Sequence, residues 1–151
     1  PTTETQRHRT YRTHRYNPDD TFASFSNYAL QLIDGTLIPL LPQISDSTGQ
    51  ISYESPATVI LGPGYYLISY GVSAILRTEG YMQITPFYNS AAHLDQGIYF
   101  KTGSDSSSAT GSTYFILYTP AQTRLNFTFN SPVSVIEGEI SLTIVKLRRT
   151  S

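Results

Sequence analysis

Apolar and polar residues alternate along much of this chain, and a period of two indicates strands with one buried face. The strongest run covers residues 66–74, whose apolar face consists of Tyr66, Ile68, Tyr70, Val72 and Ala74. The same alternation recurs at residues 124–129 and 140–145. No segment sustains the period of an amphipathic helix, so the pattern predicts an all-β chain.

Shorter segments rich in β-branched and aromatic residues lie at 22–33, 37–41, 57–61, 81–88, 97–101 and 114–118. Asp34-Gly35 predicts a hairpin turn. Gly62-Pro63-Gly64 and Glu137-Gly138 predict further turns, and the Gly- and Ser-rich residues 102–112 predict a flexible loop. About eight to ten strands in this order predict an antiparallel two-sheet sandwich of the jelly-roll type.

Several predicted strands carry large aromatic side chains on both faces. The adjacent pairs are Tyr65-Tyr66, Phe87-Tyr88, Tyr99-Phe100 and Tyr114-Phe115. A sandwich needs only one inward face per sheet, so doubled aromatics indicate a second, partly buried surface. Oligomerisation through one sheet would bury it, whereas the alternative is a solvated face lined by tyrosines.

Charge is concentrated at the start of the chain. The segment 1–20 has almost no aliphatic residues and carries Arg7, Arg9, Arg12 and Arg15. We expect a basic extended arm or linker over 1–20 and one jelly-roll domain over 21–151. The four arginines could instead contact an anion such as RNA, and the alternating Thr, Arg and Tyr residues could add a strand to the sheet edge of a partner.

Composition excludes several classes of site and partner. The 151 residues contain no cysteine, only 14% charged residues and a net charge of −1. These values exclude disulfides and Cys-ligated metals, and they disfavour nucleic acid as a partner of the whole chain. No apolar run is long enough to span a membrane.

Candidate catalytic chemistry is sparse. His93 is the only histidine after residue 20, and no nucleophile elbow accompanies it. Asp46, Asp95 and Asp105 lie in expected loops, but they lack the spacing of a calcium-ligand cluster. The sequon Asn126-Phe127-Thr128 falls within an expected strand, where chance is the better explanation. We predict no enzymatic activity, no cofactor and no metal.

One signature stands out in residues 63–73, which read Pro-Gly-Tyr-Tyr-Leu-Ile-Ser-Tyr-Gly-Val-Ser. It resembles the central strand, roughly Gly-x-Tyr-x-Ile-Ser-Tyr-x-Val, of bacterial relatives of the complement globular head and tumour necrosis factor superfamily. Residues 22–27 resemble the first strand of that family and residues 138–145 its last strand. In particular, the chain resembles the carboxy-terminal domain of collagen-like exosporium (spore-surface) glycoproteins, although it has no Gly-x-y repeat.

The resemblance implies a tight homotrimer without catalytic activity, located outside the cell or on the spore or cell surface. It would drive trimer assembly and mediate surface display or adhesion, with other surface-layer proteins or glycans as further partners. The residues assigned to the trimer interface or core are Tyr66, Ile68, Tyr70, Val72, Phe127, Phe129 and Tyr28. Two alternatives stay open: a small viral capsid or phage fibre subunit with a basic arm, and a carbohydrate-binding β-sandwich.

Overall fold

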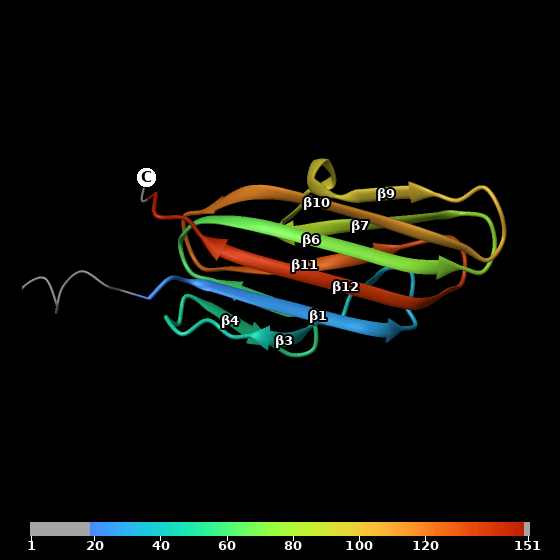
Figure 1. Ribbon diagram of the computed structural model, residues 1–151. Helices are drawn as coiled ribbons and strands as arrows, with labels where there is room; N and C mark the ends of the chain where they lie inside the picture. Colours follow the sequence, from blue (N-terminus) through green and yellow to red (C-terminus); the bar gives the residue numbers. More distant parts are fainter. Residues whose placement is uncertain (1–18, 150–151) are drawn as a thin grey trace, which may run out of the picture.

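A computed structural model describes residues 19–149 as an elongated sandwich of two β-sheets (Figure 1). Every strand pair in both sheets is antiparallel. The only helical element in this part of the chain is the short 3₁₀ turn η1 (Leu94–Gln96). The all-β, two-sheet jelly roll expected from the alternating pattern is confirmed.

The first sheet has five strands in the order β10-β6-β12-β1-β3. Their bounds are β10 (Ser107–Thr119), β6 (Gly64–Leu76), β12 (Val135–Lys146), β1 (Phe22–Leu30) and β3 (Leu41–Ile44). Strand β6 pairs along its full length with β10, from Gly64 opposite Thr119 to Leu76 opposite Ser107. The strand identified from the 63–73 signature is therefore an interior strand of this sheet, between the edge strand β10 and the middle strand β12.

The second sheet has seven strands and follows the path β4-β5-β11-β7-β8, with β2 paired to β11 and β9 paired to β7. Their bounds are β4 (Ile51–Glu54), β5 (Thr58–Leu61), β11 (Thr123–Asn130), β7 (Tyr81–Tyr88), β8 (Ala91–Ala92), β2 (Thr36–Leu37) and β9 (Ile98–Lys101). In Figure 1, β6, β12 and β1 lie side by side in the front layer.

The core fills the space between the two sheets. Its largest fully buried side chains are Tyr66, Phe127, Phe129, Ile38, Leu40, Leu61, Ile68, Leu76, Met82, Ile84, Leu117 and Leu125. Alternate residues of each strand supply this layer, as a period of two requires. Burial of these side chains is the main source of stability, at roughly 1.5–3 kcal/mol for each large apolar side chain removed from water.

Three local expectations were wrong. Asp34-Gly35 forms a turn, but it joins β1 of one sheet to β2 of the other, so it closes no hairpin. Glu137-Gly138 lies inside β12, where the register shifts between Ile136 and Glu139 as in a β-bulge. The expected loop 102–112 is shorter, because β10 already begins at Ser107.

Both described ends of the chain lie at the same end of the sandwich (Figure 1). The backbone N–H of Lys146 donates to the carbonyl of Thr21 at 2.9 Å, and Arg148 lies 3.8 Å from Asp20. No helix of residues 19–149 is long and apolar enough to cross a membrane.

Candidate functional site

The outer face of the five-stranded sheet, which we call the five-strand face, is formed by the side chains of β10, β6, β12, β1 and β3 that point away from the core. The register aligns Ile116 of β10 with Leu67 of β6, Leu67 with Val145 of β12, and Val145 with Phe22 of β1. These four residues form an apolar row across four strands. Leu41 and Ile44 of β3 extend the exposed apolar surface to the far edge of the sheet.

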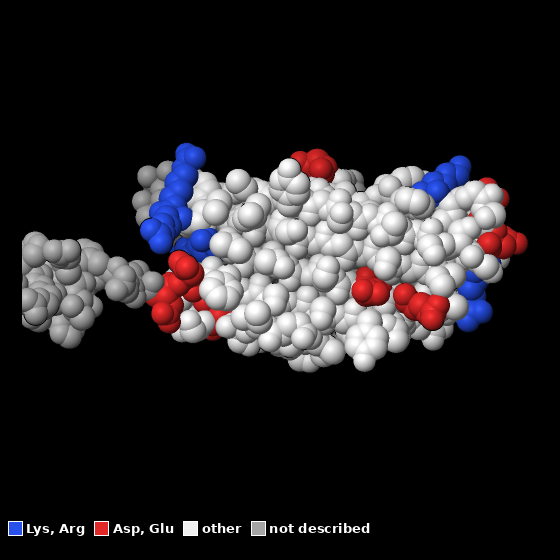
Figure 2. Space-filling view, viewed as in Figure 1, with Lys and Arg blue, Asp and Glu red and all other residues white. Residues whose placement is uncertain are grey.

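Charge is almost absent from this face. The outward positions of β10, β6, β1 and β3 carry no ionisable acid or base except tyrosine, and the acidic positions of β12 are Glu137 and Glu139, near its start. Figure 2 shows the result: the middle of the face is uncharged, and the Lys, Arg, Asp and Glu side chains gather mainly at the two ends. Most of its other outward positions are Ser, Thr or Gly. An uncharged sheet face with an exposed apolar row is a candidate surface for binding another protein.

Strand β10 is the exposed edge of this sheet. It runs for 13 residues without proline or a charged residue, and its register with β6 is unbroken. Its outward side chains Tyr114 and Ile116 are 76% and 59% exposed. Long edge strands normally carry lysine, proline or a bulge that prevents edge-to-edge pairing, and β10 has none of these, so its edge is open to pairing with another chain.

The neighbouring edge of the other sheet is also apolar. Next to β10 lie β9 and η1, and η1 exposes Leu94 at this edge, whereas Tyr99 of β9 is exposed on the outer face of the seven-stranded sheet. Gly111 of β10 allows this approach, since a Cβ there would lie 2.4 Å from Cγ2 of Ile98. The β9–β10 edge and the five-strand face together form the candidate assembly site.

The structure separates the residues assigned from the sequence to the trimer interface or core. Six lie between the sheets, each at most 2% exposed: Tyr66, Ile68, Tyr70, Val72, Phe127 and Phe129. Tyr28 instead is 75% exposed at the end of β1. The arm residues Arg7, Arg9, Arg12 and Arg15 lie outside the described residues.

Buried tyrosines use their hydroxyls within the core. Tyr66 donates to the carbonyl of Gly62 at 2.8 Å, and Tyr70 donates to that of Gln96 at 2.7 Å. Burial, followed by the negative charge of Asp46, raises the pKa of Tyr66 to about 12, and burial also raises the pKa of Tyr70. These side chains are structural, and both stay neutral at physiological pH.

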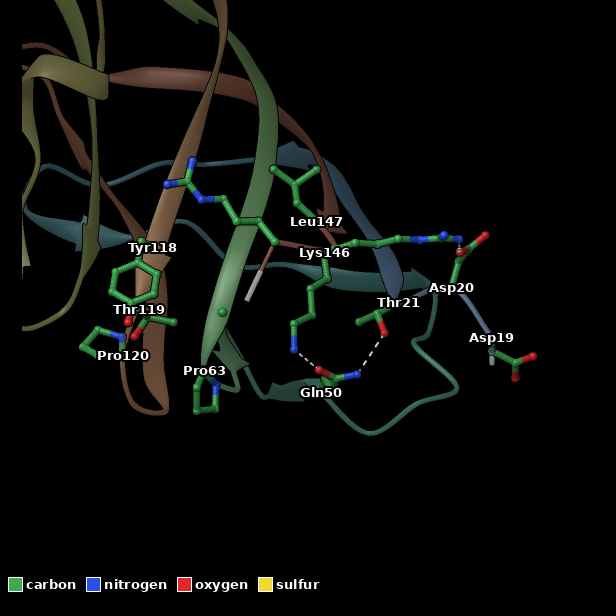
Figure 3. Close-up of a pocket in the computed structure, with 13 residues that line it drawn as sticks. Asp19, Asp20, Thr21, Gln50, Pro63, Tyr118, Thr119, Pro120, Lys146 and Leu147 are labelled. Atoms are coloured by element: carbon green, nitrogen blue, oxygen red, sulfur yellow. Dashed lines mark hydrogen bonds and ion pairs between the residues drawn. The ribbon is translucent and has the colours of Figure 1, made fainter. Parts of the chain in front are cut away.

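A second feature is an open hollow of about 900 Å³ at the end of the sandwich where the described chain begins and ends (Figure 3). Its polar wall is a chain of hydrogen bonds in which Lys146 donates to Gln50 and Gln50 donates to Thr21. Asp20 and Arg148 face each other at its rim. The hollow therefore mixes both charge signs, and its polar groups tie β1, β12 and the loop before β4 together.

Asp46 fixes that loop. Its carboxylate accepts the backbone N–H groups of Thr48, Gln50 and Ile51 at 2.9–3.1 Å. Burial raises its pKa, but the hydrogen bonds from Ile51 and the other donors outweigh burial, so the net pKa is lowered. Of the other acids considered as calcium ligands, Asp105 accepts the backbone N–H of Glu79. Residues 19–149 contain no group of three or more His, Asp or Glu side chains placed to hold a metal.

His93 stacks on Tyr88, with ring centroids 3.7 Å apart and the planes 5° from parallel. Its Nε2 lies 3.0 Å from the carbonyl oxygen of Tyr88. No serine hydroxyl among the described residues is hydrogen-bonded to this ring. The histidine thus packs against the sandwich next to η1.

The two antiparallel sheets and their strand order define a jelly-roll sandwich. The chain is similar to the globular domain of zebrafish complement 1qA protein, with a TM-score of 0.63, 12% identity, and coverage of 86% of this chain and 99% of that chain. It is similar to PRD1 vertex protein P5 (TM-score 0.60, 15% identity, 87% and 100% covered). It is also similar to murine APRIL (TM-score 0.55, 13% identity, 85% and 100% covered).

These identities are low, so the likeness shows the fold. No family model matches the sequence. No curated protein matches it either. The fold that the central-strand signature implied is therefore established by structure, independently of any sequence relative.

The candidate site contains residues that sequence reasoning did not single out, above all Leu67, Ile116 and Val145. Alternation reveals two faces per strand but does not say which one is buried. The signal that could have found the exposed row was the run Tyr114–Tyr118, where every side chain is large and apolar or aromatic. In a strand, such a run places apolar side chains on both faces at once.

Proposed function

We propose that this protein is a non-enzymatic structural module that assembles as a homotrimer through the five-strand face and the β9–β10 edge. The observation that carries the proposal is the uncharged five-strand face with its apolar row. The three similar structures support it at the level of the fold, and the family that the 63–73 signature resembles assembles as trimers.

The geometry favours a ring. A sheet face and a strand edge are different surfaces, so contact between the face of one copy and the edge of the next is heterologous. Three such contacts close into a ring, and each copy then covers the exposed β10 edge of a neighbour. The same contact would bury Ile116 and the apolar row.

Light scattering with size-exclusion chromatography tests the proposal. We expect the intact chain to have a mass about three times the 16.8 kDa of one copy, and a chain that starts at Thr21 to have three times the mass of its own shorter copy. Ile116→Arg should convert both to monomers, because the guanidinium would have to be desolvated in the contact. Leu37→Arg is the matched control, since Leu37 is exposed on the opposite sheet, and it should leave the trimer intact.

A monomer at micromolar concentration for the unmodified chain would rule out the assembly proposal. A trimer only in the intact chain would instead place assembly in residues 1–20. In that case the arm, and not the jelly-roll domain over 21–151, would hold the copies together.

In its finer form, the proposal places this trimer on the outside of a cell or spore, where it mediates display or adhesion. The resemblance of residues 63–73 to collagen-like exosporium glycoproteins supports this location. Immunolabelling of intact cells and spores of the native source tests it, and labelling only after permeabilisation would contradict it.

A second candidate function is that of a capsid or fibre subunit. The similarity to PRD1 vertex protein P5 favours it, together with the four arginines of the expected arm. This function predicts that nucleic acid co-purifies with the intact chain and is lost at high salt or when residues 1–20 are removed. An absorbance ratio typical of pure protein in low salt would exclude it.

A further inference from the structure

The outer face of the seven-stranded sheet differs in character from the five-strand face. At its centre, outward side chains of β7, β9 and β11 form what we call the amide–aromatic strip: Tyr81, Gln83, Phe87, Tyr99, Asn126 and Asn130. Met82 and Ile84 of β7 and Phe127 and Phe129 of β11 are fully buried in the core, so the alternate residues of both strands point outward.

The register brings the strip together. Asn126 lies opposite Phe87, Asn130 lies opposite Gln83, and Gln83 lies opposite Tyr99 on its other side. The rings of Tyr81 and Tyr99 stack with centroids 5.2 Å apart. At about 3.4 Å per residue, Gln83 and Phe87 are separated by roughly 13 Å along the strand. Two aromatic platforms therefore stand apart on this face with amides beside each, and the pair Thr85 and Thr128 lies between them.

Most donors and acceptors of these side-chain amides are not used within the protein. Within residues 19–149, the side chains of Gln83 and Asn126 make no hydrogen bond, and that of Asn130 makes one, to the exposed Asp34. A side-chain amide offers two donors and an acceptor in one plane. Such groups can pair with neighbouring hydroxyls of one ligand, as water does in the free protein.

The scarcity of charged side chains on the strip favours a neutral ligand. Strand β7 contains no Asp, Glu, Lys or Arg, and the only charged residue of β11 is Arg124, which is paired with Glu54. Lys101 on β9 and Asp34 beside Asn130 mark the limits of the uncharged area. An anionic polymer or nucleic acid would find no positive stripe here.

We propose that the amide–aromatic strip binds a neutral oligosaccharide chain. The apolar faces of sugar rings stack on Tyr99 and on Phe87, since an aromatic ring supplies a large, rigid apolar surface. Sugar hydroxyls pair with the amide of Asn126 beside Phe87 and with those of Gln83 and Asn130 beside Tyr99. The spacing of the platforms requires a short chain and excludes a single sugar as the full ligand.

The strip lies on the opposite side of the sandwich from the five-strand face, and of its three strands only β9 borders the β9–β10 edge used in the proposed trimer. A trimer would present three strips outward and raise the apparent affinity for a polymeric glycan. A monomer would still carry the strip, and the two proposals therefore fail separately.

The test starts with an array of immobilised neutral and acidic oligosaccharides, probed with the intact protein from a host that does not attach N-glycans, so that Asn126 stays unmodified. Titration calorimetry with the best soluble neutral oligosaccharide then gives the affinity. We expect Tyr99→Ala and Gln83→Ala each to lower it at least tenfold, and the affinity to be unchanged between 50 mM and 500 mM salt.

Tyr114→Ala is the matched control, because Tyr114 is a similarly exposed tyrosine on the five-strand face. It should leave the affinity unchanged, and near-ultraviolet circular dichroism should show that all variants are folded. The proposal is overturned if no neutral glycan is bound, if only acidic glycans are bound in a salt-dependent way, or if Tyr114→Ala weakens binding as much as Tyr99→Ala.

Discussion

A buried tyrosine hydroxyl must find an acceptor, and Tyr66 finds the carbonyl of Gly62 at the turn that precedes β6. Lys146 lies over the same ring, with Nζ 5.8 Å from its centroid. Gly64 is required nearby, because its φ of +143° is a conformation that other residues rarely adopt. A Cβ there would also lie 2.7 Å from Cε of Lys146. Tyr66 thus links the turn before β6, the core and the end of β12.

The raised pKa of Tyr66 has a consequence at high pH. In the unfolded chain the hydroxyl ionises near pH 10, whereas in the folded protein it ionises only near pH 12. Its contribution to stability is therefore fully present below pH 10 and is lost as the pH rises toward 12. We expect the free energy of unfolding to fall over this interval, and to fall less steeply in Tyr66→Phe. Urea unfolding at a series of alkaline pH values measures both slopes, and Tyr28→Phe, an exposed tyrosine, should keep the unmodified slope.

The lowered pKa of Asp46 predicts that stability falls at acidic pH, the opposite of the effect of Tyr66. Its lowered pKa means that its contribution is present above the ordinary value of 3.8 and is lost as the pH falls through the folded-state value. Asp46→Ala leaves three backbone N–H groups without their acceptor and should cost about 2 kcal/mol at pH 7. The difference in unfolding free energy from the unmodified protein, measured by urea unfolding, should shrink as the pH falls below 3.8. Asp95→Ala, which removes an exposed carboxylate from η1, should change stability by less than about 0.5 kcal/mol.

At the level of the element, the junction between η1 and β9 depends on close backbone approach. A Cβ at Gly97 would lie 2.5 Å from the carbonyl oxygen of Ile84, and neither backbone can move without breaking the β7–β9 ladder. We expect Gly97→Ala to destabilise the protein by about 2 kcal/mol. Gly103→Ala is the control, because a Cβ there meets nothing within 4 Å. Equal midpoints of chemical unfolding for the two variants would contradict this prediction.

The alternation of apolar and polar residues was sufficient to predict the strands in which it is regular. Strand β7 has the predicted bounds, and β6, β11 and β12 extend the predicted runs by one to five residues at each end. The first half of β10 was missed because Ser and Gly there are common in loops. Their small side chains suit a strand that Ile98 approaches closely. Asp34-Gly35 was misread because a turn signal is local and does not say which sheet the chain enters next.

The candidate site was less predictable than the fold. The sequence indicated a second apolar surface, but it assigned Tyr66 and Tyr70 to either the interface or the core. Only the pairing of sheets shows that these side chains point inward and that Leu67 and Ile116 point outward. Chemistry that depends on several strands, such as the amides opposite Phe87 and Tyr99, is set by register. Register is fixed by tertiary packing, which local pattern does not contain.

At the scale of the whole molecule, the sandwich separates its surfaces by chemistry. The five-strand face carries an apolar row and little charge, and on the side seen in Figure 2 the charged side chains gather mainly at the ends. The opposite face carries the amide–aromatic strip. The described chain begins and ends at one end of the sandwich, and the loop between β9 and β10 lies at the opposite end (Figure 1).

This arrangement predicts that assembly contributes to stability. Folded copies bind one another and unfolded chains do not, so the melting temperature of the intact protein should rise with protein concentration. In Ile116→Arg the melting temperature should be lower and independent of concentration, because no assembly remains to be lost. Leu37→Arg should retain the concentration dependence of the unmodified chain. Thermal melts followed by circular dichroism at protein concentrations a hundredfold apart distinguish these cases. A melting temperature that is constant for the unmodified chain while light scattering reports a trimer would mean that the copies separate before they unfold, and that each jelly roll is stable by itself.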